Sequence, residues 1–139
     1  MSLVGPRPNV KDETDLYTET EKGLLAIKPG ITDFSSIVFS DEGDILKGKD
    51  NPDLVYNQLI RPWKSRLGLI YIQNQSFLLD VKIIIYTLIA ITSKQKALNW
   101  VSSQLKLMNV DLKVINMSKR EEELYPFPPP GMDKIITER

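Results

Sequence analysis

Residues 71–91, YIQNQSFLLDVKIIIYTLIAI, contain the longest apolar run of the chain, which starts at Phe77. Only Asp80, Lys82 and Thr87 interrupt this run before it ends. A membrane-spanning helix needs about 20 apolar residues, and this run is shorter than that. A helix that is apolar on most sides is buried in a core or lies against another apolar surface. We therefore expect the other helices to pack around an apolar helix at about residues 77–91.

Ser76, directly before this run, is a suitable helix N-cap, because its hydroxyl can accept a hydrogen bond from the first helical turn. A strand is the alternative, since residues 83–85 are three β-branched isoleucines. The length of the run and the lack of an internal turn signal favour the helix. On that helix Asp80 faces inward, so we expect it to accept from Arg66 or to cap a neighbouring helix.

The composition excludes several kinds of site. The chain has 139 residues, enough for one domain with one core. Its 18 basic and 18 acidic residues balance, so we expect no nucleic-acid partner. It contains no Cys and no His, which removes disulfides, thiolate nucleophiles, imidazole bases and the usual zinc ligands. The first residues lack the pattern of a signal peptide, and this favours a cytoplasmic location, free or at the inner face of a membrane.

The start of the chain combines a short apolar segment with a rigid turn. Ser2-Leu3-Val4 predicts a strand, and Gly5 and Pro6-Arg7-Pro8 follow it. The two prolines hold Arg7 in an extended backbone. Its guanidinium is thereby suited to bidentate binding of a phosphate or a carboxylate. A surface turn with a solvated Arg7 is the alternative.

Two segments carry local helix signals. Thr18-Glu19-Thr20-Glu21 matches a capping box, so a short helix should follow and end before the turn signal at Pro29-Gly30-Ile31-Thr32. Asn51-Pro52-Asp53 is a strong helix start, and that helix continues to Arg61. Pro62 either ends it or begins a second helix, whose face would carry Trp63, Leu67, Ile70 and Tyr71.

Residues 34–39 supply a second apolar cluster, FSSIVF, which we expect to form a small sheet or hairpin with residues 2–4. The predicted fold class is therefore α+β, mostly helical.

The C-terminal third leaves one alternative open. Residues 94–108 have the pattern of an amphipathic helix, which either packs on the core or lies in a membrane interface with its lysines toward anionic headgroups. Residues 110–115 predict a short strand. The last residues, 119–139, combine an acidic run with the proline-rich sequence YPFPPPG, so we expect an extended, solvated tail.

Four segments, in this order and spacing, resemble the bacterial sugar transferases, the monotopic phosphoglycosyl transferases of capsule, exopolysaccharide and O-antigen synthesis. They are residues 1–8, MSLVGPRP; residues 16–32, from LYT to KPGIT; the surroundings of Arg66-Leu67; and residues 71–83 with Thr87. On this resemblance, residues 1–110 form the C-terminal portion of a sugar transferase domain, and residues 111–139 form a flexible proline-rich extension.

The resemblance implies an enzyme at the cytoplasmic face of the inner membrane, peripheral or monotopic. It would move a sugar 1-phosphate from a UDP-sugar to undecaprenyl phosphate with Mg²⁺. A carboxylate nucleophile suits this step, because it splits one phosphoryl displacement into two. The substrate-binding residues would be Arg7, Pro6, Pro8, Thr32 and Asp33, with Arg7 neutralising the diphosphate.

In this family a membrane-dipping helix and a catalytic Asp-Glu pair precede the segment that matches residues 2–8. The pairs present here, Asp12-Glu13 and Asp41-Glu42, lack the family's context and are expected to be solvated acids. We therefore assign no catalytic residue and no metal ligand, and expect the isolated chain to be inactive or to need a separate N-terminal half. The alternative function is a non-catalytic peripheral membrane or partner-binding module.

Overall fold

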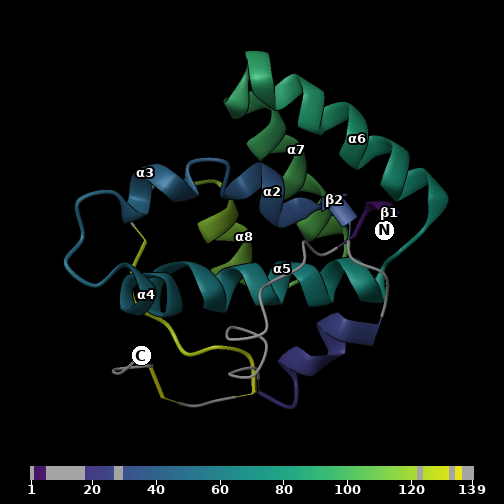
Figure 1. Ribbon diagram of the computed structural model, residues 1–139. Coiled ribbons are helices and arrows are strands. Elements are labelled where there is room, and N and C mark those ends of the chain that lie inside the picture. Colours follow the sequence, from purple (N-terminus) through teal and green to yellow (C-terminus); the bar gives the residue numbers. More distant parts are fainter. Residues whose placement is uncertain (1, 6–17, 27–29, 122–123, 132–133, 136–139) are drawn as a thin grey trace.

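The computed structural model describes residues 2–5, 18–26, 30–121, 124–131 and 134–135 (Figure 1). The described part is mostly helical, which confirms the larger part of the predicted fold class. The elements in order are β1 (Ser2–Val4), the 3₁₀ helix η1 (Glu21–Ala26), β2 (Gly30–Thr32), α2 (Phe34–Val38), α3 (Glu42–Leu46), α4 (Pro52–Val55), the π-helical turn η2 (Tyr56–Ile60), α5 (Arg61–Gln73), α6 (Phe77–Thr92), α7 (Lys94–Leu107) and α8 (Leu112–Ser118).

Strand content is limited to the short parallel pair β1–β2, in which Ser2 lies opposite Gly30. A Cβ at position 30 would lie 2.2 Å from the backbone nitrogen of Gly5, so only glycine permits this close approach. The expectation that residues 34–39 form the second strand was wrong. Asp33 caps the helix α2 there by accepting from the backbone N–H of Ser36.

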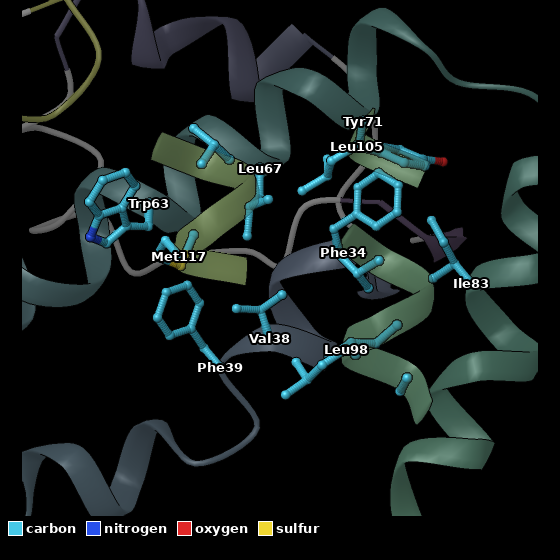
Figure 2. Packing of buried hydrophobic residues seen from close by; sticks show 14 of the residues in the cluster. Phe34, Val38, Phe39, Trp63, Leu67, Tyr71, Ile83, Leu98, Leu105 and Met117 are labelled. Carbon is cyan, nitrogen blue, oxygen red and sulfur yellow. The ribbon is translucent and has the colours of Figure 1, made fainter. Parts of the chain in front are cut away.

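The core is centred on α5 and not on α6. Trp63, Leu67 and Tyr71 of α5 are fully buried, as the predicted helical face requires. They contribute to one cluster with residues of α2 and α7, among them Phe34 and Leu105 (Figure 2). This cluster forms because α5 contacts α2, η1 and α8, whereas α6 packs mainly on α7.

Helix α6 begins where the sequence indicates, since the Ser76 hydroxyl accepts from the backbone N–H of Leu79 at 3.1 Å. The expectation that the other helices pack around it was wrong. Only Leu79 and Ile83 of α6 are fully buried. Tyr86 joins it to α7 by stacking on Trp100, with ring centroids 4.4 Å apart. One flank of the helix therefore faces the protein, and the rest faces outward (Figure 1).

The two alternatives for the helices around Pro62 and at residues 94–108 are both decided. Asn51 caps α4, and the chain passes through η2 into α5, where Pro62 occupies the first turn. Proline is tolerated there because the π-helical turn η2 interrupts the regular helix before it, and the Gln58 carbonyl, four residues earlier, accepts from the Phe127 N–H instead. Helix α7 buries its apolar face, including Ala97 and Val101, in the core, so that face does not lie in a membrane interface.

Residues 110–115 do not form the predicted strand, because Asp111 caps α8 by accepting from the backbone N–H of Lys113. The proline-rich segment (residues 124–131) has no helix or strand, as expected, but it is docked rather than solvated. The Phe127 ring stacks on Trp63 with centroids 4.5 Å apart, and the Phe127 N–H donates to the Gln58 carbonyl.

Candidate functional site

The two strands bring together the segments that carry the predicted substrate-binding residues. The backbone N–H of Gly5, directly after β1, donates to the Thr32 carbonyl at 3.0 Å. Gly5, the last described residue before Pro6, therefore lies beside Thr32 at the carboxyl ends of two parallel strands. Pro6, Arg7 and Pro8 themselves lie outside the described residues, as does the pair Asp12-Glu13.

Asp33 has a structural role that the sequence did not reveal. One oxygen, Oδ1, accepts from the Ser36 N–H and from the hydroxyls of Ser35 and Ser36 at 2.7–3.2 Å. Burial raises the pKa of Asp33, and the hydrogen bonds from Ser35 and Ser36 offset this effect only in part. This carboxyl group orders the start of α2, next to the segment that continues into Arg7.

Two contacts connect this region to α6 and α5. The hydroxyls of Thr32 and Thr87 lie 2.8 Å apart. The Tyr71 hydroxyl donates to Asp80 at 2.5 Å, so Asp80 has a structural role. The prediction that Asp80 accepts from Arg66 was wrong. Partial burial and the bond to Asp80 raise the pKa of Tyr71, so this hydroxyl keeps its proton at neutral pH.

The second acidic pair, Asp41-Glu42, was expected to be solvated. In the structure both side chains form ion pairs instead. Arg120 donates from two nitrogens to Asp41 at 2.9 Å, and Lys94 lies 3.4 Å from the same carboxylate. Partial burial raises the pKa of Asp41, but the bonds and charge of Arg120 outweigh it, and the net pKa is lowered. Glu42 pairs with Lys64 at 3.1 Å.

The acids near the candidate site do not fit a magnesium site. Mg²⁺ in proteins is held by one or two carboxylates with water and substrate phosphates. Asp33, Asp41 and Asp80 are each committed to hydrogen bonds or ion pairs, and no group of three or more candidate ligands occurs within the described ranges. These three acids are therefore each held by protein donors, and the described residues show no larger cluster of metal ligands.

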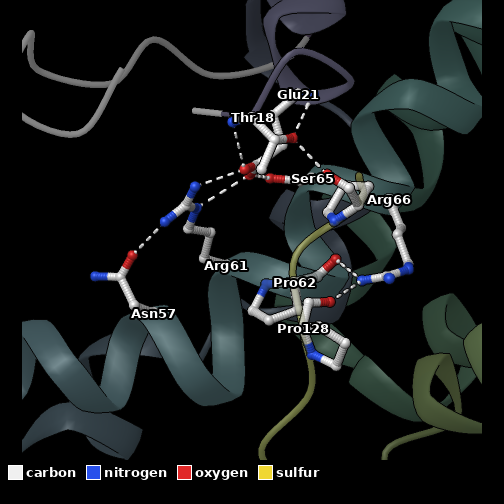
Figure 3. Close-up of polar contacts among 9 residues, drawn as sticks. Thr18, Glu21, Asn57, Arg61, Pro62, Ser65, Arg66 and Pro128 are labelled. Carbon is white, nitrogen blue, oxygen red and sulfur yellow. Dashed lines mark hydrogen bonds and ion pairs between the residues drawn. The ribbon is translucent and has the colours of Figure 1, made fainter. Parts of the chain in front are cut away.

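A buried ion pair fixes the segment before β2 to the central helix (Figure 3). Arg61 donates to both oxygens of Glu21, at 3.0 and 2.5 Å, and the Ser65 hydroxyl donates to the same carboxylate at 2.6 Å. Glu21 also accepts from the Thr18 N–H, while Thr18 Oγ1 accepts from the Glu21 N–H, so the predicted capping box is confirmed.

The sequence analysis did not identify Arg61 and Ser65 as partners of Glu21. A signal was present, since Asn57, Arg61 and Ser65 are spaced four residues apart and form a polar line on a helix. In the structure Arg61 donates to Asn57 at 2.8 Å, so all three members of the line belong to one buried network. Because the Glu21 carboxylate is saturated by these donors, the network positions η1 and offers no free group for chemistry.

Helix α6 carries an apolar surface that no other part of the described protein covers. Its exposed large side chains are Phe77, Leu78, Val81, Ile85, Leu88 and Ile91. The helical period places them on one side of α6. None of the described helices is both long and apolar enough to cross a membrane.

Comparisons with known proteins give consistent matches. A family model described as bacterial sugar transferase matches residues 1–94. The uncharacterized sugar transferase EpsL of Bacillus subtilis is 36% identical over 87 residues, which are 63% of this chain and 35% of that protein. The galactosyl transferase CpsE of Streptococcus agalactiae is 35% identical over 88 residues, 63% of this chain and 16% of that protein. No solved structure matches the chain significantly.

Proposed function

Because the chain belongs to the bacterial sugar transferase family, we propose that it is part of an enzyme that moves a sugar 1-phosphate from a UDP-sugar to undecaprenyl phosphate. The observation that carries this proposal is the family match over residues 1–94. The chain spans about a third of one curated relative and about a sixth of the other. The complete reaction would therefore need further chemical groups, which the rest of such an enzyme would supply. The product would serve capsule, exopolysaccharide or lipopolysaccharide synthesis.

The geometry around β1 and β2 supports a role in donor binding. The bond from Gly5 to Thr32 holds the last described residue before Pro6 beside the end of β2, and Asp33, directly after β2, caps α2. An Arg on such a turn binds a diphosphate through a planar pair of donors and neutralises its charge. We propose Arg7 as the diphosphate contact, and Pro6, Pro8, Thr32 and Asp33 as the residues that hold it in place.

The proposal assigns no nucleophile to this chain. Asp41 is held by Arg120 and Lys94, and a carboxylate in two ion pairs is poorly available for attack on phosphorus. Mg²⁺ belongs to the proposal through the family alone, and we derive no step through it. The isolated chain is expected to bind a UDP-sugar without releasing UMP.

Isothermal titration of the purified chain with UDP-galactose and UDP-glucose, with and without Mg²⁺, tests donor binding. UDP-galactose is included because one relative is named a galactosyl transferase. Arg7→Gln should weaken binding about tenfold or more, as expected for one charge-assisted contact. Lys22→Gln, which removes an exposed lysine paired only with Glu19, is the matched control. Binding that is equal in all three proteins would contradict the role of Arg7.

A UMP-release assay with undecaprenyl phosphate tests the second part of the proposal. The expected result is no turnover by this chain alone at any Mg²⁺ concentration. Turnover by the purified chain would show that one of its own carboxylates acts as the nucleophile, and it would overturn the assignment.

The apolar surface on α6 supports a second candidate function, a non-catalytic module that binds the cytoplasmic membrane surface or a partner such as a separate N-terminal half. Exposed apolar patches of this kind mark membrane or protein interfaces. Flotation with vesicles containing anionic lipid tests the membrane form. Leu88→Glu should abolish co-flotation, whereas Leu107→Glu, which changes a leucine on α7 that is also largely exposed, should not. A soluble monomer that never floats would contradict membrane binding.

A further inference from the structure

A cavity of about 310 Å³ lies on the side of α5 that faces α8. Trp63 and Phe127, stacked on each other, form its aromatic wall, and Ile70 and Val114 add apolar surface from α5 and α8. Its volume is at the lower end of the range for small-molecule sites. Part of its lining, from Met108 to Phe127, lies outside the residues that the family model matches. None of the predicted substrate-binding residues lines it.

The walls of this cavity are ordered by backbone contacts. After α7 the chain makes a Schellman turn, in which the Val110 N–H donates to the Leu105 carbonyl and the Asn109 N–H to the Lys106 carbonyl, both at 3.2 Å. Asn109 takes the left-handed conformation that this turn requires, with φ of 58°. The next residues are fixed by the Asp111 cap of α8. The cavity is therefore formed before any ligand arrives.

Donors without full partners gather at this cavity. The indole nitrogen of Trp63 is buried and has no hydrogen-bond partner among the described residues. Arg66 bonds the carbonyls of Pro62 and Pro128 through a single nitrogen, Nη1 (Figure 3). Lys113 lies over the Phe127 ring at 5.6 Å and forms no ion pair within the described part of the chain.

The charges around the cavity do not cancel. Arg66 and Lys113 contribute two positive charges, and Asp111 is the only carboxylate in the lining. The Asp111 carboxylate already accepts from the Lys113 backbone at 2.9 Å. One positive charge thus remains next to an aromatic and aliphatic wall.

We propose that this cavity binds a small organic monoanion with an aromatic or aliphatic body. Its acid group would accept from Arg66 and Lys113, and its body would lie on the apolar wall formed by Trp63 and Phe127. A neutral sugar would leave the excess charge unpaired, and an inorganic anion would leave the apolar wall unfilled. This site is separate from the β1–β2 region and does not depend on the transferase proposal.

The test uses the whole chain and 1-anilinonaphthalene-8-sulfonate, an aromatic monoanion, as the probe. The chain has two tryptophans, so Trp100→Phe leaves Trp63 as the sole emitter. Quenching of Trp63 by energy transfer then reports bound probe, and the effect of Lys113→Gln assigns the binding to this cavity. In this background Lys113→Gln should weaken the titration about tenfold, as expected for one charge-assisted contact. Lys106→Gln, an exposed lysine on α7 outside the cavity, should leave it unchanged.

Two further titrations test separately the charge and the apolar body of the ligand. Uncharged N-phenylnaphthylamine should bind at least about tenfold more weakly than the anion, for the same reason. Inorganic phosphate, an anion without an apolar body, should not displace the probe at equal concentration. Equal binding of the charged and uncharged probes, or no effect of Lys113→Gln in a protein with an unchanged urea midpoint, would overturn the proposal.

Discussion

Glu21→Gln tests whether the buried ion pair holds the N-terminal segment on α5. Glu21 is fully buried and Arg61 is 3% exposed, so the substitution removes a buried negative charge that two nitrogens of the Arg61 guanidinium contact. Removing one partner of a buried pair costs about 3–5 kcal/mol. That is a large part of the about 5–15 kcal/mol that stabilises an ordinary domain. With a urea dependence of about 2 kcal/mol per M, the unfolding midpoint should fall by about 2 M.

The assay is urea denaturation followed by circular dichroism, with Glu19→Gln as the control. Glu19 lies two residues away and pairs with Lys22 at the surface, where such pairs contribute little. The double variant Glu21→Gln with Arg61→Met should regain part of the loss, because it removes the buried guanidinium together with the carboxylate that it contacts. If Glu21→Gln shifts the midpoint no more than Glu19→Gln does, the network does not hold η1 on α5.

Three further predictions concern the contacts around the two strands and the proline-rich segment. Asp33→Asn keeps an oxygen that can accept all three bonds now made to Oδ1, and it removes a group whose pKa burial raises. The stabilisation from a protonated Asp33 is complete below the unfolded pKa of about 4, and it is lost as the pH rises through the raised folded pKa. Above the folded pKa the urea midpoint of the variant should therefore exceed that of the wild type, and at low pH the two midpoints should converge. A variant that is less stable than the wild type at pH 8 would contradict this. Gly30→Ala should destabilise by about 2 kcal/mol or more and speed amide exchange at Gly5, whereas Gly43→Ala, with no atom within 4 Å of the new methyl group, should do neither. Phe127→Ala should cost about 1–3 kcal/mol and shift the Trp63 emission to the red, and unchanged emission would mean that the segment does not cover Trp63 in solution.

The sequence predicted the parts of the fold that depend on neighbouring residues. The capping box at Thr18, the cap at Ser76 and the helix start at Asn51 all occur as expected, because each involves residues three positions apart. The parts that depend on distant partners were not predicted. Residues 34–39 are apolar because they enter the core, and a strand and a short buried helix both satisfy that pattern.

The position of α6 shows the same limit. The composition of this helix predicted a buried centre, yet composition does not say which surface covers an apolar helix, and here only one flank is covered by the described protein. For the candidate site, the sequence predicted that residues 2–4 form a strand, and the structure adds its neighbour Thr32. The role of Arg7 stays a prediction, because this residue lies outside the described part. Arg61 was read only as the end of a helix, since a buried arginine has the same local pattern as an exposed one.

The docking of the proline-rich segment also constrains how this protein is made. The Thr18 hydroxyl donates to the Pro130 carbonyl, a contact between residues 112 positions apart, and Gly131 takes a left-handed backbone beside Thr18 and Thr20. A ribosome must therefore synthesise the chain at least to residue 131 before the turn at Thr18 can complete its contacts. Contacts of such long sequence separation form late and slow folding. Residues around Thr18 thus lack this contact while the 112 residues that separate Thr18 from Pro130 are synthesised, and a product that stalls between them would leave the contact unmade.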